Sequence, residues 1–144
     1  MTEKRKYTLI NSILIAVFAA VYIKAISDSG FISDLFSSEI DAAAKLTSCA
    51  AAAVLFLLFA GLFAFISFVF RKFKIYTGYM VFAVLSGLFI ISAPFHNTSR
   101  SWIAWQWYYL FELKAGMFIV FLFPAILVIS LLSRFLLKKF SSHD

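Results

Sequence analysis

Residues 46–70 read LTSCAAAAVLFLLFAGLFAFISFVF, and none of these side chains carries a charge. A helix rises about 1.5 Å per residue, so a run of this length can cross the roughly 30 Å hydrocarbon core of a bilayer. The run therefore predicts a transmembrane helix, and it indicates the class of the whole chain.

Three further uncharged apolar stretches occupy residues 7–23, 75–95 and 115–133. Lipid offers no hydrogen-bond partner to a backbone, so each stretch is expected to be helical, and no strand-like alternation suggests a barrel. With flanking residues, the expected spans are about 7–26, 42–70, 75–95 and 109–137. The sequence predicts an all-α integral membrane protein, a single domain over residues 1–144 with four transmembrane helices in an antiparallel bundle.

The composition of the chain supports this class. Its 144 residues are 63% hydrophobic and only 14% charged, and 19 of them are phenylalanine. A soluble domain averages about 45–50% apolar and about 25% charged residues. A soluble fold of this size could not bury so much apolar surface, whereas lipid can cover it, so the lipid bilayer is the first expected partner.

The placement of basic residues predicts the orientation. An even number of spans puts nine of the 13 Lys and Arg residues on the side of both termini: Lys4, Arg5, Lys6, Arg71, Lys72, Lys74, Arg134, Lys138 and Lys139. The opposite side has Lys24, Lys45, Arg100 and Lys114. Basic loops stay in the cytoplasm, so both termini are predicted to be cytoplasmic. Short loops and a compact chain favour a bacterial inner membrane.

The N-terminal segment has a second interpretation. Its basic start and apolar run resemble a secretory signal with small residues at Ala25 and Ser27, and cleavage would leave three spans. The run is longer than usual and Lys24 interrupts the cleavage region, so the uncleaved helix is preferred. The basic residues of the chain are dispersed at helix ends without a nucleic-acid motif, which argues against a nucleic-acid partner.

A dense aromatic segment precedes the last span. Residues 101–114 read SWIAWQWYYLFELK and hold all three tryptophans of the protein. Trp and Tyr concentrate at membrane interfaces, which favours an interfacial anchor. Trp, Tyr and Arg are also enriched at interaction hot spots, so a recognition site remains an alternative. The candidate interaction residues are Arg100, Trp102, Trp105, Trp107, Tyr109 and Glu112.

Local motifs predict details of the helices. Small residues four apart, such as Cys49/Ala53 and Ala83/Gly87, predict close helix packing within the bundle, and a contact between two copies is the weaker alternative. Residues 31–36 are expected to form a short helical stretch on the membrane face. Ser38 is expected to cap the second span, with the acidic Glu39 and Asp41 in its first turn. Pro124 should kink the last span, as a static bend more readily than as a hinge.

The sequence shows no sign of an active site. Two histidines and one cysteine stand apart, without metal-ligand spacing, a phosphate loop or a nucleophile triad, so no enzyme, metal or cofactor is predicted. The four uncharged stretches hold no Asp, Glu, Lys, Arg or His, which disfavours an ion-coupled carrier. Neutral polar residues within the spans can bridge helices, and Asn11 is the most costly of them if it faces lipid.

Three functions are compatible with these features. The preferred hypothesis is a non-enzymatic accessory or regulatory protein that acts by helix packing and by outer-face interaction with another membrane protein or with itself. The second is an immunity or exclusion protein. In size, topology and charge alone, the chain resembles immunity proteins against pore-forming bacteriocins. The third is a small transporter or channel subunit.

Overall fold

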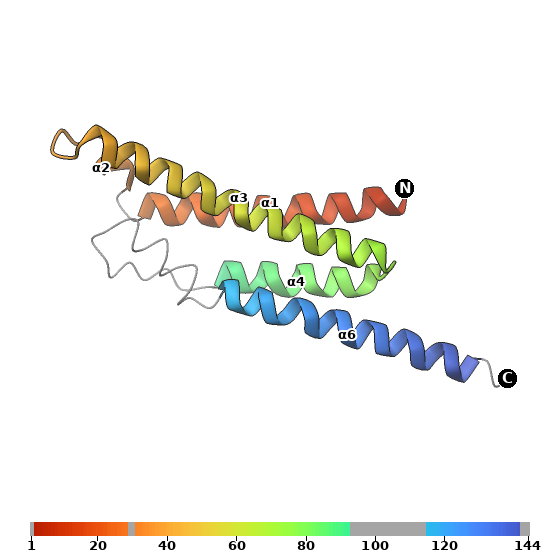
Figure 1. Ribbon diagram of the computed structural model, residues 1–144. Helices are drawn as coiled ribbons and strands as arrows, with labels where there is room; N and C mark the ends of the chain where they lie inside the picture. Colours follow the sequence, from red (N-terminus) through yellow and green to blue (C-terminus); the bar gives the residue numbers. More distant parts are fainter. Residues whose placement is uncertain (1, 29–30, 93–114, 142–144) are drawn as a thin grey trace.

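The computed structural model describes residues 2–28, 31–92 and 115–141, and every regular element among them is an α-helix. The elements are α1 (Glu3–Asp28), α2 (Phe31–Phe36), α3 (Ala42–Lys72), α4 (Tyr76–Ser92) and α6 (Ala115–Ser141) (Figure 1). No strand occurs in these residues, so the predicted all-helical class is confirmed for them.

Three of the helices are long and apolar enough to cross a membrane. These are α1, α3 and α6, and this confirms the prediction of membrane-length apolar helices. The fourth, α4, has 17 described residues, which at about 1.5 Å each fall short of a roughly 30 Å hydrocarbon core. The predicted span continued to residue 95, and residues 93–95 lie outside the described part of the chain.

The helices extend beyond the apolar stretches that predicted them. α1 begins at Glu3, ahead of the predicted start at residue 7, and α6 continues to Ser141. Lys and Arg are good helix formers, so the backbone remains helical where the side chains become charged. The predicted start of the last span, residues 109–114, is outside the described residues. Pro124 lies inside α6 as expected.

Two tyrosines of α1 fix its position along α3. The Tyr7 hydroxyl donates a hydrogen bond to the Phe70 carbonyl at 3.3 Å, and the Tyr22 hydroxyl donates to the Ala52 carbonyl at 2.9 Å. The start of α1 therefore lies beside the end of α3, and its end lies beside the start of α3. α4 packs against α1 and α6. In Figure 1 the start of α1, the α3–α4 turn and the end of α6 lie at one end of the molecule.

Aromatic rings fill the space between the helices. Phe18 of α1 stacks on Phe59 of α3, with ring centroids 4.9 Å apart, and meets Phe63 edge-on at 5.8 Å. A second group joins Phe70 of α3 to Phe82 of α4 and Phe123 of α6. Aromatic pairs add about 0.5–1.5 kcal/mol beyond their buried area, so these rings hold the helices in register.

A polar pair also links two helices. The Tyr79 hydroxyl of α4 donates a hydrogen bond to the Asn11 side-chain oxygen of α1 at 3.1 Å. Asn11 therefore bridges α1 and α4, as neutral polar residues in the spans can. The bond satisfies an amide oxygen that would be costly to leave unpaired in an apolar environment.

The predicted cap of the second span is wrong, although the helix begins at residue 42 as expected. α3 begins at Ala42 with Asp41 at its N-cap, and the Asp41 side chain makes no capping hydrogen bond. The Ser37 hydroxyl accepts the Glu39 backbone N–H at 3.2 Å instead. This local turn competes with the helix, so Ser38 is not its cap, and Glu39 and Asp41 precede the first turn.

The short segment before α3 is helical as expected. α2 spans Phe31–Phe36, and its two ends differ in exposure. Phe31 is buried in a small cluster with Ala52, whereas Phe36 is 87% exposed. α2 is therefore attached to α3 through its first residue.

The small-residue pairs divide between the inside and the outside of the molecule. On α4, Ala83 is buried and Gly87 is half-buried, so that pair packs within the chain as predicted. On α3, Cys49 and Ala53 are exposed. The prediction of intramolecular packing is wrong for them, because α1 covers the adjacent face of α3 that carries Ala52.

The α3–α4 connection is a Schellman turn. The Ile75 N–H donates to the Phe70 carbonyl at 3.0 Å, and the Lys74 N–H donates to the Arg71 carbonyl at 3.0 Å. Lys74 has a φ of 54°, the left-handed conformation that such a turn requires. Ile75 and Phe70 are both buried, which supplies the usual apolar contact across the turn.

Lys74→Gly is expected to stabilise the protein by about 0.5–1 kcal/mol. A left-handed residue with a side chain costs roughly 1–2 kcal/mol, and part of the gain is lost to the greater freedom of glycine in the unfolded state. Unfolding in detergent micelles by titration with dodecyl sulfate measures the change. Lys74→Val removes the same charge but places a branched side chain at positive φ, so it should destabilise. Equal effects of both variants would show that charge, and not φ, decides the stability.

Candidate functional site

The predicted interaction segment lies outside the described residues. Arg100, Trp102, Trp105, Trp107, Tyr109 and Glu112 all fall within residues 93–114. Their role as an anchor or as a recognition site therefore stays a prediction. The described helices hold a different candidate site.

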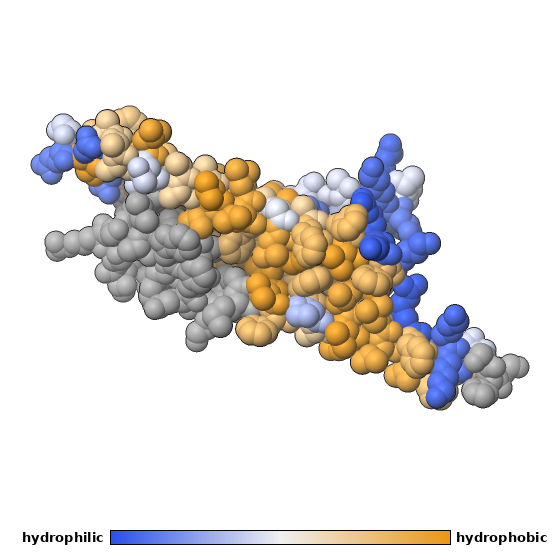
Figure 2. All heavy atoms as spheres, viewed as in Figure 1, coloured by the Kyte–Doolittle hydropathy of each residue, from blue (hydrophilic) through white to orange (hydrophobic). Residues whose placement is uncertain are grey.

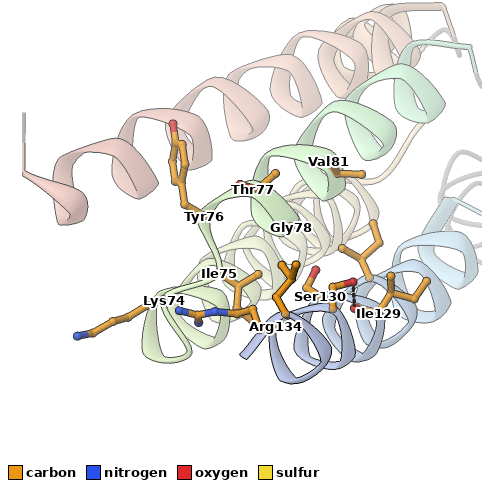
Figure 3. A pocket seen from close by; sticks show the side chains of 12 residues that line it. Lys74, Ile75, Tyr76, Thr77, Gly78, Val81, Ile129, Ser130 and Arg134 are labelled. Carbon is orange, nitrogen blue, oxygen red and sulfur yellow. Dashed lines mark hydrogen bonds between the residues drawn. The ribbon is translucent and has the colours of Figure 1, made fainter. Parts of the chain in front are cut away.

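A groove of about 540 Å³ runs between α4 and α6 (Figure 3). We refer to it as the α4–α6 groove. Its lining residues are Lys74, Ile75, Tyr76, Thr77, Gly78, Val81, Ile126, Ile129, Ser130, Ser133, Arg134 and Leu137. Ligand pockets of small molecules commonly enclose about 300–1,000 Å³, so the groove is large enough to hold part of a ligand.

A glycine sets the distance between the two helices. A Cβ atom at Gly78 would lie 2.5 Å from the Ser130 hydroxyl oxygen and 2.8 Å from a methyl carbon of Ile75. Only a residue without a side chain allows this approach. Gly78 thus brings α6 against α4.

A cation at one end ties α6 to the α3–α4 turn. The Arg134 guanidinium donates a hydrogen bond from Nη1 to the Phe73 carbonyl at 2.6 Å. Figure 3 shows Arg134 reaching from α6 toward the segment that carries Lys74 and Ile75. That bond uses one of the five N–H groups of a guanidinium. Arg134 therefore fixes one end of α6 to the α3–α4 turn, and its other N–H groups can donate to a ligand.

The remainder of the groove is apolar with a few hydroxyls. Val81, Ile126 and Ile129 provide the apolar surface away from the basic end. The Ser133 hydroxyl donates to the Ile129 carbonyl of its own helix at 2.8 Å, so its hydrogen-bonding need is met within α6. The groove therefore has a long apolar wall and two cationic residues at one end, where the Lys74 side chain is directed away from Arg134 (Figure 3).

The lining groups of the α4–α6 groove suit the binding of a ligand. Within the described residues, no group of three His, Cys, Asp or Glu side chains lies close enough together to hold a metal ion. The groove lining offers two cations, hydroxyls and an apolar surface, and these groups recognise an anion attached to a hydrocarbon.

Comparisons with protein-family models, with curated proteins and with solved structures find no match to this chain.

A second groove provides a contrast. It lies between α1 and α4, measures about 340 Å³ and is lined by apolar residues such as Leu14, Met80 and Val84. Among the described residues, none that lines this groove is charged. A hydrocarbon chain could enter this groove, but nothing in it would select a headgroup.

The sequence indicates part of the α4–α6 groove. Lys74 and Arg134 are among the nine basic residues predicted to lie on one side of the membrane. Their pairing was missed because it depends on α6 packing beside α4.

Proposed function

We propose that α1, α3, α4 and α6 cross a bacterial inner membrane as an antiparallel four-helix bundle with both termini in the cytoplasm. The nine basic residues predicted to be cytoplasmic support this orientation. The tyrosine bonds between opposite ends of α1 and α3 support the antiparallel pairing. Figure 2 shows an apolar band across the helices with hydrophilic residues gathered at both ends.

We propose further that the protein is non-enzymatic and works as an accessory or regulatory subunit, by lateral association with another membrane protein or with a second copy. The observation that carries this proposal is two groups of small exposed residues on one face of α3, separated by the exposed Leu57. We call them the α3 outer face: Cys49, Ala50, Ala53, Gly61 and Ala64. A Cβ atom at Gly61 would meet nothing within 4 Å, so the chain leaves this surface uncovered.

Small residues favour contact between helices in a membrane. Lipid covers large apolar side chains as well as a protein does, so hydrophobicity alone does not drive association there. Small side chains let two backbones approach and gain van der Waals contact. The small residues of the α3 outer face support association for this reason, and the exposed Leu57 between them would pack against the partner.

A double variant tests the association. Ala53→Leu with Ala64→Leu is expected to lower the recovery of co-purifying membrane proteins about tenfold, because bulky side chains separate the backbones. The tagged full chain is purified from native membranes in mild detergent, and its partners are quantified by mass spectrometry. Val84→Leu is the matched control, since Val84 is 55% exposed on α4.

The cysteine of the same face reports whether the partner is a second copy. Cys49 is exposed and is the one cysteine of the chain, so any disulfide it forms joins two molecules. A cross-linked dimer that disappears in the double variant would identify self-association. Recovery of the same proteins in the same amounts from wild type and double variant would refute the role of the α3 outer face.

A further inference from the structure

We propose that the α4–α6 groove binds one anionic phospholipid. The phosphate of the headgroup interacts with Arg134 and Lys74, and one acyl chain lies along Val81, Ile126 and Ile129. The inference rests on the proposed placement of the helices across the bilayer, because only that placement brings the groove to the level of the headgroups. It does not depend on association through the α3 outer face.

The charges of the groove favour an anion. Lys74 and Arg134 line one end, and no acidic residue is among the lining residues that the structure describes. Arg134 is already oriented by its bond to the Phe73 carbonyl, so a phosphate meets a guanidinium that has lost much of its rotamer freedom. Guanidinium donors match phosphate oxygens in geometry as well as in charge.

The dimensions of the groove favour a lipid over a free anion. Ile126 lies two helical turns before Arg134 on α6, about 12 Å along the helix axis. Val81 lies at a similar distance from Lys74 along α4. A phosphate at the basic end would thus leave the apolar wall uncovered, whereas an acyl chain attached to it covers that wall.

The apolar groove between α1 and α4 lacks the feature that would select an anionic lipid. It offers hydrocarbon contact without a cation, so any lipid there is held no better than its neighbours in the bilayer. Basic pockets between transmembrane helices on the cytoplasmic side bind acidic headgroups in general. The α4–α6 groove has both a cationic end and an apolar wall, and this combination distinguishes it from an ordinary lipid-facing surface.

Native mass spectrometry of the purified full chain in a non-ionic detergent tests the proposal. The protein is titrated with dioleoyl phosphatidylglycerol or with dioleoyl phosphatidylcholine, which share acyl chains and differ in net charge. We expect one phosphatidylglycerol molecule to bind at least about tenfold more tightly than phosphatidylcholine. Lys74→Gln with Arg134→Gln should remove that preference. Equal affinity of the wild type for both lipids would overturn the proposal.

Two further variants separate binding from folding and from general charge. Ser133→Trp keeps both cations and fills the groove from an exposed position of α6, and it should also weaken phosphatidylglycerol binding. Lys4→Gln with Arg5→Gln removes two charges from the same predicted membrane side. These residues line a separate pocket on α1 and not the α4–α6 groove, so binding should stay within about threefold of wild type. An equal loss in that control, or wild-type binding by Ser133→Trp, would overturn the proposed site.

Competition identifies the source of the phosphate. Glycerol 3-phosphate added at the lipid concentration should leave the bound phosphatidylglycerol in place, and displacement would indicate a site for a soluble phosphate. A reporter fused after Asp144 tests the membrane placement separately and should be active only in the cytoplasm. An active reporter outside refutes the proposed placement, whereas lost lipid selectivity with a cytoplasmic reporter refutes the groove alone.

Discussion

Phe63→Ala is expected to lower the free energy of unfolding by about 3 kcal/mol, the largest effect of any single change considered. Phe63 is 0% exposed, and its ring contacts Phe18 edge-on at 5.8 Å and Phe59 at 6.3 Å. Truncation leaves a cavity between α1 and α3 that the stacked rings cannot fill without losing their own contacts. Titration of the protein in detergent micelles with dodecyl sulfate measures the loss.

Phe65→Ala is the matched control for this change. Phe65 lies two residues later on the same helix, and it is 57% exposed. The ring contacts lipid or detergent, and these molecules fill the space when the ring is removed. The free energy of unfolding should therefore change by about 0.5 kcal/mol or less. Equal effects at both positions would show that the aromatic core does not hold α1 against α3.

Gly78→Ala should have the second largest effect, a loss of about 1–3 kcal/mol with separation of α4 from α6. The added methyl would lie 2.5 Å from the Ser130 hydroxyl oxygen and 2.8 Å from a methyl carbon of Ile75. Either α6 moves outward or the Schellman turn around Ile75 distorts. Dodecyl sulfate titration measures the stability, and a distance between spin labels on α4 and α6 reports the separation.

Gly61→Ala supplies a control of opposite sign. A Cβ atom at Gly61 meets nothing within 4 Å, so alanine gains helix propensity without a clash and should stabilise α3 by up to about 1 kcal/mol. Gly78→Ala combined with Ser130→Ala should recover part of the lost stability, because the hydroxyl is one of the two closest contacts. A stabilising Gly78→Ala would mean that α4 and α6 do not approach as closely as the structure shows.

Local features of the helices were predictable where local chemistry decides them. The apolar run at residues 46–70 gave the body of α3, and residues 31–36 gave α2, because length and composition determine whether a segment is helical in lipid. The cap of α3 was predicted wrongly because two serines compete there: Ser38 has capping-box spacing to Asp41, but Ser37 forms the turn and Asp41 takes the N-cap position. Such a choice depends on differences of about 1 kcal/mol between neighbouring caps.

The candidate groove was less predictable than the helices. Lys74 and Arg134 belong to different helix ends, far apart in the sequence, and their common position follows from α4 and α6 packing through Gly78. The sequence does not indicate which residue of another helix lies against Gly78. A glycine within a membrane helix indicates that another helix packs closely against it, but the spacing of residues does not identify that helix.

The sequence by itself determined that this chain is helical, that its apolar helices have membrane length and that its positive charges are unevenly distributed. Each of these properties depends on the composition of one continuous segment, so no tertiary contact is needed to determine it. Only the tertiary structure decided which face of each helix is inside: Ala83 is buried and Ala53 is exposed, although both belong to small-residue pairs of the same spacing. In water, polar residues mark the outer face of a helix. Lipid accepts apolar residues on every face, so the inner face is identified only when the neighbouring helix is in place.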